Sequence, residues 1–219
     1  MIENQRRRTV TTFYVVRHGE TLLNSIGRAQ GWSDSPLTDN GKRTAAELGA
    51  ELNGIIFNAA YTSDMIRAEQ TAKLILSMSG NNNIEIQKDI RLREWCLGSM
   101  EAEHNSLFIQ TVSDWLGVSS FAELNRRLLD VATAIYEHDT TGAAEPFEDI
   151  SSRLKNVFMD IAQSKLRNEN SNILIVTHAF AIKTLIYLFA PEKLCVIDKV
   201  KNATTLRLLY NGSRFYFQE

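Results

Sequence analysis

The stretch TFYVVRHGE, residues 12–20, decides the fold, and NILIVTHA, residues 172–179, has the same design. In each stretch, a run of apolar, β-branched and aromatic residues passes almost directly into a histidine. Short runs of this composition are typical of strands that are buried on both faces of a sheet. We therefore predict strands over residues 12–16 and 172–176.

Helical and strand patterns alternate between these two stretches. In residues 38–52, Thr38 is a suitable cap and the alanines and leucines after it have helical spacing, which predicts a helix. Similar helical spacing predicts helices over 64–78, 150–167 and 180–189. Short apolar runs predict strands over 55–62 and 84–87. Alternation of this kind predicts parallel β-α-β units. We expect an α/β fold, a three-layer sandwich with a mostly parallel central sheet and helices on both faces.

Two segments depart from the alternation. Residues 98–146 have helical character without adjacent strands, and we interpret them as a helical cap inserted into a single domain that covers residues 1–219. Residues 204–217 are divided by Asn211-Gly212, and this dipeptide between apolar runs predicts a β-hairpin because both turn positions accept a positive φ.

The composition excludes several classes of protein. Of the 219 residues, 44% are hydrophobic, which is enough for a sizeable core. Lys and Arg total 24 against 26 Asp and Glu, so the net charge is −2, and we expect no nucleic-acid partner. The most apolar segment, 173–190, contains His178 and Lys183, and we therefore expect no membrane span.

The cysteine content and the first residues bear on the compartment. Cys96 and Cys195 cannot build a disulfide framework, and no apolar run of signal-peptide length follows the basic N-terminus. Both features fit a cytoplasmic protein. The Arg6–Arg8 cluster is either a solvated tail, which we favour, or a contact for an anionic partner. Nothing in the sequence specifies an oligomeric state.

Residues with chemical potential follow the predicted strands. The carboxyl ends of parallel strands meet at one edge of a sheet, where ligands bind. Arg17 and His18 follow the first strand, and His178 follows the late strand. Arg67 and Glu94 come after the two strands between them. We expect all five side chains to surround one site.

The charge of this set indicates a phosphoryl group as the ligand. Two arginines and two histidines make a cationic pocket, and an arginine fork binds a dianion through paired hydrogen bonds. Neighbouring cations favour a neutral imidazole, which can attack phosphorus and form a phosphohistidine. Glu94, with a pKa raised by burial, would protonate the leaving oxygen and later take a proton from water.

Each of these residues also has a structural interpretation. A histidine after a strand often serves packing, and an arginine such as Arg67 at the start of a helix is often a surface salt-bridge partner. Glu94 alone indicates little. Zinc is an alternative ligand for paired histidines, although the sequence has no H-x-x-x-H or C-x-x-C spacing and arginines repel a cation.

Five blocks of sequence carry a more specific signal. In chain order they are VRHGET (16–21) with Asn24, QGW with PLT (30–38), SDMIRA (63–68), LRE (92–94) and VTHA (176–179). Their order and spacing resemble the histidine phosphatase superfamily, which includes the cofactor-dependent phosphoglycerate mutases. The resemblance covers nearly the whole chain.

The resemblance implies a role for each matching position. His18 would be the phosphorylated nucleophile, and Glu94 the general acid and base. Arg17, Arg67 and His178 would form the phosphate pocket. Four further positions are assigned to substrate binding: Asn24, Gln30, Gly31 and Ala179. Because family members need no metal, we expect neither a metal nor another cofactor.

Departures from the family pattern separate three hypotheses. Where the mutases carry Glu-Arg-His-Tyr-Gly, residues 94–98 read EWCLG, and this apolar character favours a phosphatase acting on a small phosphomonoester over a mutase. Ala144-Glu145-Pro146 replaces a frequent Gly-Glu-Ser, which leaves the role of Glu145 open. The third hypothesis is a non-catalytic module that binds phosphorylated ligands.

Substrate specificity is expected to come from the cap. Aromatic and apolar side chains in and beside it either line an apolar wall or belong to the core: Trp95, Leu97, Phe108, Trp115 and Phe121.

Overall fold

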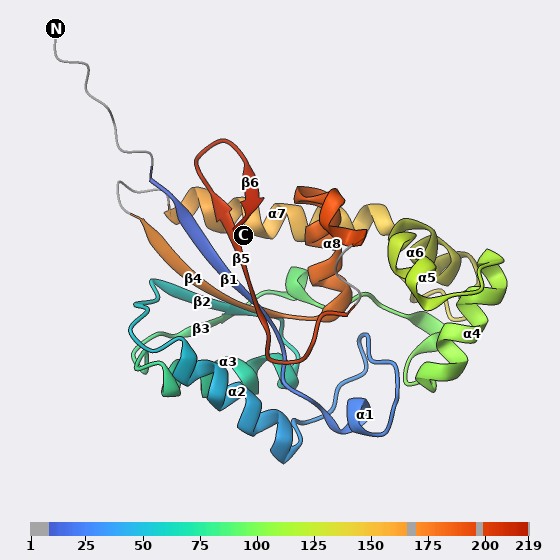
Figure 1. Cartoon of the computed structure of the whole chain (residues 1–219), viewed down its shortest axis with the longest axis horizontal. Helices are drawn as coiled ribbons and strands as arrows, with labels where there is room; N and C mark the ends of the chain where they lie inside the picture. Colours follow the sequence, from blue (N-terminus) through green and yellow to red (C-terminus); the bar gives the residue numbers. More distant parts are fainter. Residues whose placement is uncertain (1–8, 166–169, 196–198, 219) are drawn as a thin grey trace, which may run out of the picture.

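The computed structural model describes residues 9–165, 170–195 and 199–218. Within these ranges, the chain forms one six-stranded sheet with the order β3-β2-β4-β1-β5-β6 (Figure 1). The strands span Thr11–Arg17 (β1), Ala59–Thr62 (β2), Ile86–Lys88 (β3), Ser171–Thr177 (β4), Thr205–Tyr210 (β5) and Phe215–Phe217 (β6). The first four in spatial order run parallel, whereas β5 and β6 are antiparallel to their neighbours.

Helices occupy the segments between the strands. The α-helices span Leu22–Ser25 (α1), Asp39–Glu51 (α2), Ile66–Met78 (α3), Asn105–Leu116 (α4), Phe121–Arg126 (α5), Leu128–Glu137 (α6), Phe147–Lys165 (α7) and Ala179–Phe189 (α8). Short 3-10 helices span Ile90–Leu92 (η1), Gly98–Met100 (η2) and Pro191–Cys195 (η3). No helix among the described residues has the length and apolar character needed to cross a membrane.

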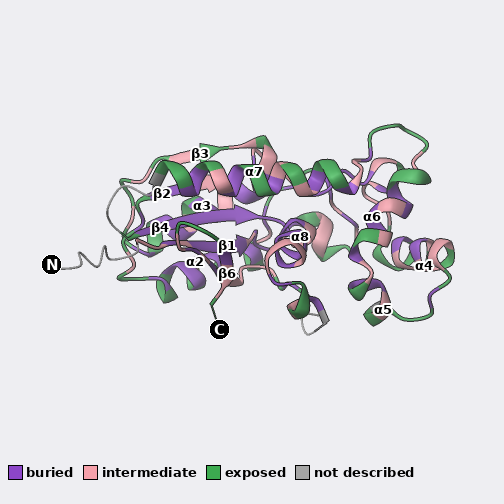
Figure 2. Cartoon of the chain, turned by 90° about the horizontal axis from the view of Figure 1, so that it is seen from above, coloured by how far each residue is buried: buried purple, intermediate pink, exposed green. Residues whose placement is uncertain are grey.

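Alternation along the central strands creates two separate cores. In β1, Phe13 and Val15 face one core while Tyr14 and Val16 face the other, as the two-residue period of a strand requires. Helices α2 and α3 cover the Tyr14 face, and α7 and α8 cover the Phe13 face, on opposite sides of the sheet in Figure 1. Figure 2 shows the central strands as the most buried layer. The predicted α/β three-layer fold is confirmed.

The close approach of α2 and α3 depends on one glycine. A Cβ atom on Gly49 would lie 2.8 Å from the carbonyl oxygen of Ile75 and 2.8 Å from the Cβ atom of Met78. Only glycine allows this spacing between the two helix backbones. Helix α2 begins where the sequence predicts, because the Thr38 hydroxyl accepts a hydrogen bond from the Gly41 amide.

The register of the two central strands fixes the position of the site. β1 and β4 pair in parallel so that Arg17 is level with Thr177, and the His18 amide donates to the Thr177 carbonyl at 3.0 Å. The residues that follow the two strands, His18 and His178, therefore leave the sheet side by side. Strand β2 pairs on the other side of β4 and delivers Ser63 to the same edge.

Residues 98–146 hold η2, α4, α5 and α6, which lie together at one end of the molecule (Figures 1 and 2). Phe108 and Val112 of α4 and Leu128 of α6 belong to the same hydrophobic core as Phe13. The helices are thus continuous with the core on one face of the sheet. Trp95, Leu97 and Phe108 are buried and Trp115 is half-buried, whereas the side chain of Phe121 lies outside the described residues.

Two predicted boundaries are wrong by three residues or more, and several others differ by one or two residues. The strand predicted over 55–62 begins only at Ala59, and Ile56 is among the most exposed large apolar side chains described, because residues 55–58 precede the point where β2 meets β4. Helix α7 begins at Phe147, three residues before its predicted start at Ile150. Its predicted end at Arg167 and the Arg6–Arg8 cluster lie outside the described residues.

The predicted hairpin is present, but the turn chemistry differs. Gly212 has a φ of +88°, whereas Asn211 does not adopt a positive φ. The Asn211 side-chain oxygen instead accepts hydrogen bonds from the amides of Ser213 and Arg214. The asparagine therefore acts as a side-chain cap for the turn.

Candidate active site

His18 has a fixed tautomer. Its Nδ1 atom lies 2.7 Å from the carbonyl oxygen of Gly19, and because a carbonyl only accepts, Nδ1 carries the proton. The lone pair is consequently on Nε2. Burial lowers the pKa of His18 well below its usual value, and the charges of Arg67 and Arg17 lower it further. The imidazole is therefore neutral near pH 7.

His178 lies across from it, with the two ring centroids 5.2 Å apart and the ring planes tilted by 59°. The Nδ1 atom of His178 accepts from Nε of Arg67 at 3.2 Å, so the proton is on Nε2, which donates to the hydroxyl of Ser63 at 2.8 Å. Burial, followed by the charge of Arg67, lowers the pKa of His178 well below its usual value. The Ser63 hydroxyl thus keeps its own proton for another acceptor.

Arg17 has unused donors at the site. Its Nη1 atom donates to the carbonyl of Val200 at 2.7 Å, and its buried Nε atom has no partner among the described residues. Burial lowers the pKa of Arg17 to about 10, although the charge of Glu94 raises it and that of Arg67 lowers it. An arginine with this pKa is still cationic at pH 7. A buried cation with an unpaired N–H group can bind an anion.

Arg67 is fully buried, and most of its donors are already used by the protein. Nε donates to His178, and Nη1 donates to the Ser33 carbonyl and to the Asp34 carboxylate, both at 2.9 Å. Nη2 donates to the Gly31 carbonyl at 2.6 Å. One of its five N–H groups is then left within the described part of the chain. The interpretation of Arg67 as a surface salt-bridge partner is wrong, because its side chain is fully buried in the ion pair with Asp34.

Glu94 accepts three backbone hydrogen bonds. Its Oε1 atom accepts from the amides of Trp95 at 3.0 Å and Ala181 at 2.9 Å, and its Oε2 atom accepts from Phe180 at 2.9 Å. The last two amides belong to the first turn of α8, where a helix has unpaired N–H groups. Burial raises the pKa of Glu94, and these N–H groups together with Arg67 oppose the rise.

The four residues assigned to substrate binding occupy different environments. The Gln30 side chain accepts from the Thr21 hydroxyl at 2.7 Å, and the Asn24 side-chain oxygen accepts from the Thr21 amide at 3.4 Å. The Gly31 amide donates to Glu101. Ala179 opens α8 directly after His178. The hydrogen bonds of Asn24, Gln30 and Gly31 therefore hold the loop around the site.

Sequence reasoning missed the residue that anchors this loop. Glu101 accepts from the amides of Gly31, Trp32 and Ser33 and from the amide of Leu97. It joins the loop that contacts Arg67 to the segment that follows Glu94.

Two other contributors had no sequence signal. The side-chain amide of Asn202 donates to the His18 carbonyl at 3.0 Å and to the Asn24 side chain at 3.3 Å. Arg153 of α7 donates to the Glu94 carbonyl at 2.9 Å. Both residues are far in sequence from the groups that they contact, and their roles depend on the tertiary fold.

An aromatic and charged cluster borders Glu94. The indole N–H of Trp32 donates to the Glu94 carbonyl at 3.0 Å, and the Arg93 guanidinium lies 4.6 Å from the centroid of the Trp32 ring. Arg93 also pairs with Asp64, with 2.7 Å between Nε and Oδ1. This hydrogen bond lowers the pKa of Asp64 and raises that of Arg93. The carboxylate therefore neutralises Arg93.

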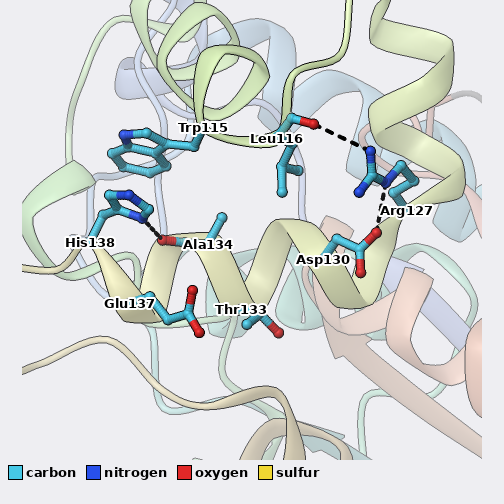
Figure 3. Close-up of a pocket in the computed structure, with 8 residues that line it drawn as sticks. All are labelled: Trp115, Leu116, Arg127, Asp130, Thr133, Ala134, Glu137 and His138. Atoms are coloured by element: carbon cyan, nitrogen blue, oxygen red, sulfur yellow. Dashed lines mark hydrogen bonds and ion pairs between the residues drawn. The ribbon is translucent and has the colours of Figure 1, made fainter.

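A separate hollow lies between α4 and α6 and shares no lining residue with the histidine site (Figure 3). The Trp115 and His138 rings stack along it with centroids 4.2 Å apart, and His138 donates from Nδ1 to the Ala134 carbonyl. Arg127 pairs with Asp130 on its other side. Across the described ranges, no three His, Cys, Asp or Glu side chains are grouped in a way that could hold a metal ion.

A buried pair of histidines at the carboxyl edge of a doubly covered sheet, flanked by arginines and a carboxyl group, defines a class of phosphoryl-group enzymes. The chain belongs to branch 1 of the histidine phosphatase superfamily, which it matches over residues 13–219. This superfamily contains phosphatases and phosphoglycerate mutases. The predicted family is confirmed.

Particular relatives carry both kinds of name. The chain is 31% identical to the probable phosphoglycerate mutase GpmB of Enterobacter sp. (strain 638), over 79% of this chain and 72% of that protein. A crystal structure of phosphoglycerate mutase from Bacillus anthracis superposes with a TM-score of 0.91 and 34% identity, covering 97% of this chain and 93% of the other. A mycobacterial glucosyl-3-phosphoglycerate phosphatase shares the fold, with a TM-score of 0.73 and 21% identity, and the match covers 95% of this chain and 97% of that one.

Proposed function

We propose that this protein is a metal-independent phosphatase that hydrolyses a small phosphomonoester through a phosphohistidine on His18. The hydrogen bond between Nδ1 of His18 and the Gly19 carbonyl carries the proposal, because it leaves the lone pair on Nε2. The depressed pKa of His18 keeps this lone pair free of a proton. A neutral imidazole of fixed orientation is the form required of a nucleophile.

In the first step, Nε2 of His18 attacks phosphorus while the bond from phosphorus to the ester oxygen breaks. The N–H groups of Arg17 and the remaining N–H group of Arg67 bind the phosphoryl oxygens. The Ser63 hydroxyl and the His178 ring lie beside them. Charge spreads over these oxygens in the transition state, so fixed donors at this place lower the barrier.

The leaving oxygen takes a proton from Glu94. Oε1 of Glu94 already accepts two backbone N–H groups, whereas Oε2 accepts one, so the free lone pair that can carry the proton is on Oε2. In the second step, water attacks phosphorus, Glu94 takes a proton from that water, and the bond from phosphorus to Nε2 breaks. Inorganic phosphate leaves, and His18 and Glu94 return to their initial states.

The positive charge that phosphoryl transfer needs comes from arginine. Arg17 and Arg67 supply two guanidinium groups beside the histidines, and each lowers the pKa of His18 through its charge. The same charges make the pocket unfavourable for a metal cation. The reaction as proposed therefore needs no cofactor.

Phosphoglycerate mutase is the second candidate, and the names of the relatives favour it. A mutase returns the phosphoryl group to a carboxylated sugar acid, which basic residues must hold. In this chain, Trp95 and Leu97 each have only 1% of their surface exposed, and Trp95 stacks on Phe180 with ring centroids 4.7 Å apart. The apolar segment is thus part of the core, which supports the phosphatase.

The two reactions are distinguished by their products. The protein is incubated with an aryl phosphate in excess chelator, and separately with 3-phosphoglycerate and a bisphosphoglycerate primer. Phosphate release that continues in chelator and is lost in His18→Ala supports the phosphatase. Primer-dependent isomerisation of phosphoglycerate without net phosphate release contradicts it. Tight binding of phosphorylated ligands with no turnover and no acid-labile phosphoenzyme would indicate a binding module.

A further inference from the structure

Arg153 and Glu145 form a bidentate ion pair beside the segment that ends in Glu94. Nε of Arg153 lies 2.8 Å from Oε1 of Glu145, and Nη2 lies 2.9 Å from Oε2. Both side chains are mostly buried, with 13% and 15% of their surface exposed. This arrangement gives Glu145, which stands in an atypical Ala-Glu-Pro context, a structural partner.

The remaining donors of Arg153 bind three backbone carbonyls in that segment. Nη1 donates to the Arg91 carbonyl at 2.9 Å and the Arg93 carbonyl at 2.7 Å, and Nη2 donates to the Glu94 carbonyl at 2.9 Å. All five N–H groups of this guanidinium are thereby used. Glu145 continues the set, because its Oε2 atom accepts from the Cys96 amide at 3.1 Å.

The ion pair supplies hydrogen-bond partners that a neighbouring strand would otherwise supply to the backbone of residues 91–96. Residues 91–96 lie beyond β3 and consist of the end of η1 and irregular chain, yet Leu92, Glu94 and Trp95 are buried. Buried carbonyl and amide groups need partners, which a sheet would normally supply. Here one guanidinium and one carboxylate satisfy the backbone on both sides of Glu94.

From these contacts we infer that Arg153 and Glu145 are positioning residues for Glu94, an inference that rests on the proposed role of Glu94 as the acid and base. The Glu94 carboxyl group is held by the first turn of α8, while its backbone is held by α7 through Arg153. Neither Arg153 nor Glu145 contacts the two histidines. After burial and the charge of Arg67, the charge of Arg153 also lowers the pKa of His178, but the hydrogen bonds of the pair act on the place of Glu94. A displacement of a reacting group by about 1 Å is enough to slow a reaction by about 100-fold.

The test compares Arg153→Met with a matched control, Arg91→Met. The Arg91 side chain also joins the η1 region to α7, through Asp89 and Asp160, but it does not bind the Glu94 backbone. For each variant, kcat and KM are measured with an alkyl phosphate, whose leaving group needs a proton, and with p-nitrophenyl phosphate, whose leaving group does not. Glu145→Gln is made in parallel and read in the same way, so that the test stands if Arg153→Met does not fold.

We expect Arg153→Met to lower kcat for the alkyl ester by about 10- to 100-fold, as for other losses of supporting contacts, with KM little changed. The p-nitrophenyl ester should lose far less in kcat/KM, which reports formation of the phosphoenzyme and not the later attack of water that also needs Glu94. Arg91→Met should behave as wild type. In a Glu94→Gln background, Arg153→Met should have almost no further effect, because it acts through Glu94.

Equal losses of kcat/KM for both esters, or additive losses in the double variant, would overturn the positioning role. Alkyl-ester turnover at the wild-type rate in Arg153→Met would overturn it as well. The proposed function fails in a different way. If Glu94→Gln alone shows no preferential loss with the alkyl ester, Glu94 is not the acid, whatever Arg153→Met does.

Discussion

Methionine substitutions of Arg17 and Arg67 should separate phosphate binding from stability. Among the described residues, Arg17→Met removes a single side-chain hydrogen bond, to the Val200 carbonyl, so we expect little change in unfolding temperature. The site loses the donors that grip the anion. Two charge-assisted hydrogen bonds at about 1.5–3 kcal/mol each correspond to phosphate binding weakened by about 10²- to 10⁴-fold.

Arg67→Met should lower the stability of the fold more than Arg17→Met does. It removes the counter-charge of Asp34 and leaves the carbonyls of Gly31 and Ser33 without these donors. Removing one partner of a buried ion pair costs about 3–5 kcal/mol, and because Asp34 is 22% exposed we expect about 3 kcal/mol. At about 2–4 °C per kcal/mol, the unfolding temperature should fall by about 6–12 °C.

The assays are calorimetric titration with inorganic phosphate or vanadate and thermal unfolding followed by circular dichroism. Lys42→Met serves as the control, because the one ion pair of Lys42 within the described part of the chain is with an exposed Asp39. Wild-type phosphate affinity in Arg17→Met would refute the assignment of Arg17 as the main anion ligand. An unchanged unfolding temperature in Arg67→Met would refute the structural role of Arg67.

The remaining predictions use the same protein. His18→Ala should abolish turnover with the fold intact. His138→Ala, a control in the hollow between α4 and α6, should keep the wild-type kcat. Activity in His18→Ala would refute the assignment of His18 as the nucleophile. The pKa values of His18 and His178 are depressed in the folded state, so the unfolded state binds more protons below pH 6.5. The free energy of unfolding should therefore fall as the pH drops through 6.5, by about 1.4 kcal/mol per histidine per pH unit. Unfolding temperatures between pH 7.5 and 5.5 should show this decline, and a His178→Ala profile as steep as wild type would contradict it. Gly31→Ala should destabilise by about 1–3 kcal/mol in thermal unfolding, because its Cβ atom would lie 2.2 Å from Oε1 of Glu101 and 2.4 Å from the Trp95 carbonyl; a wild-type unfolding temperature would show that the loop can move aside.

The convergence of the two histidines was predictable because it depends on strand direction. Each histidine follows a run of buried strand residues, and parallel pairing in register brings Arg17 level with Thr177. The same logic places Arg67 and Glu94 at this edge. Periodicity and strand ends are properties of short segments, and a sequence displays them directly.

The division of work between the two arginines was not predictable. Arg67 binds the carbonyls of Gly31 and Ser33, and its donors are used because a loop 34 to 36 residues earlier in the chain wraps around it. Arg153 and Asn202 contribute through contacts across 59 and 184 residues of sequence. Such contacts depend on irregular backbone, for which a sequence has no periodic signal. The turn at Gly212 also differs from the prediction, because hydrogen bonds to the Asn211 side chain stabilise it in place of a positive φ at Asn211.

The most direct measurement is the position of the phosphoryl group on the enzyme during turnover. A rapid alkaline quench preserves phosphohistidine, peptide mapping locates it, and ³¹P NMR distinguishes the two nitrogen isomers. A phosphoryl group on Nε2 of His18 is the predicted result, since Nδ1 donates to the Gly19 carbonyl. A phosphoryl group on Nδ1, on another residue, or on none while phosphate is being released would contradict the account.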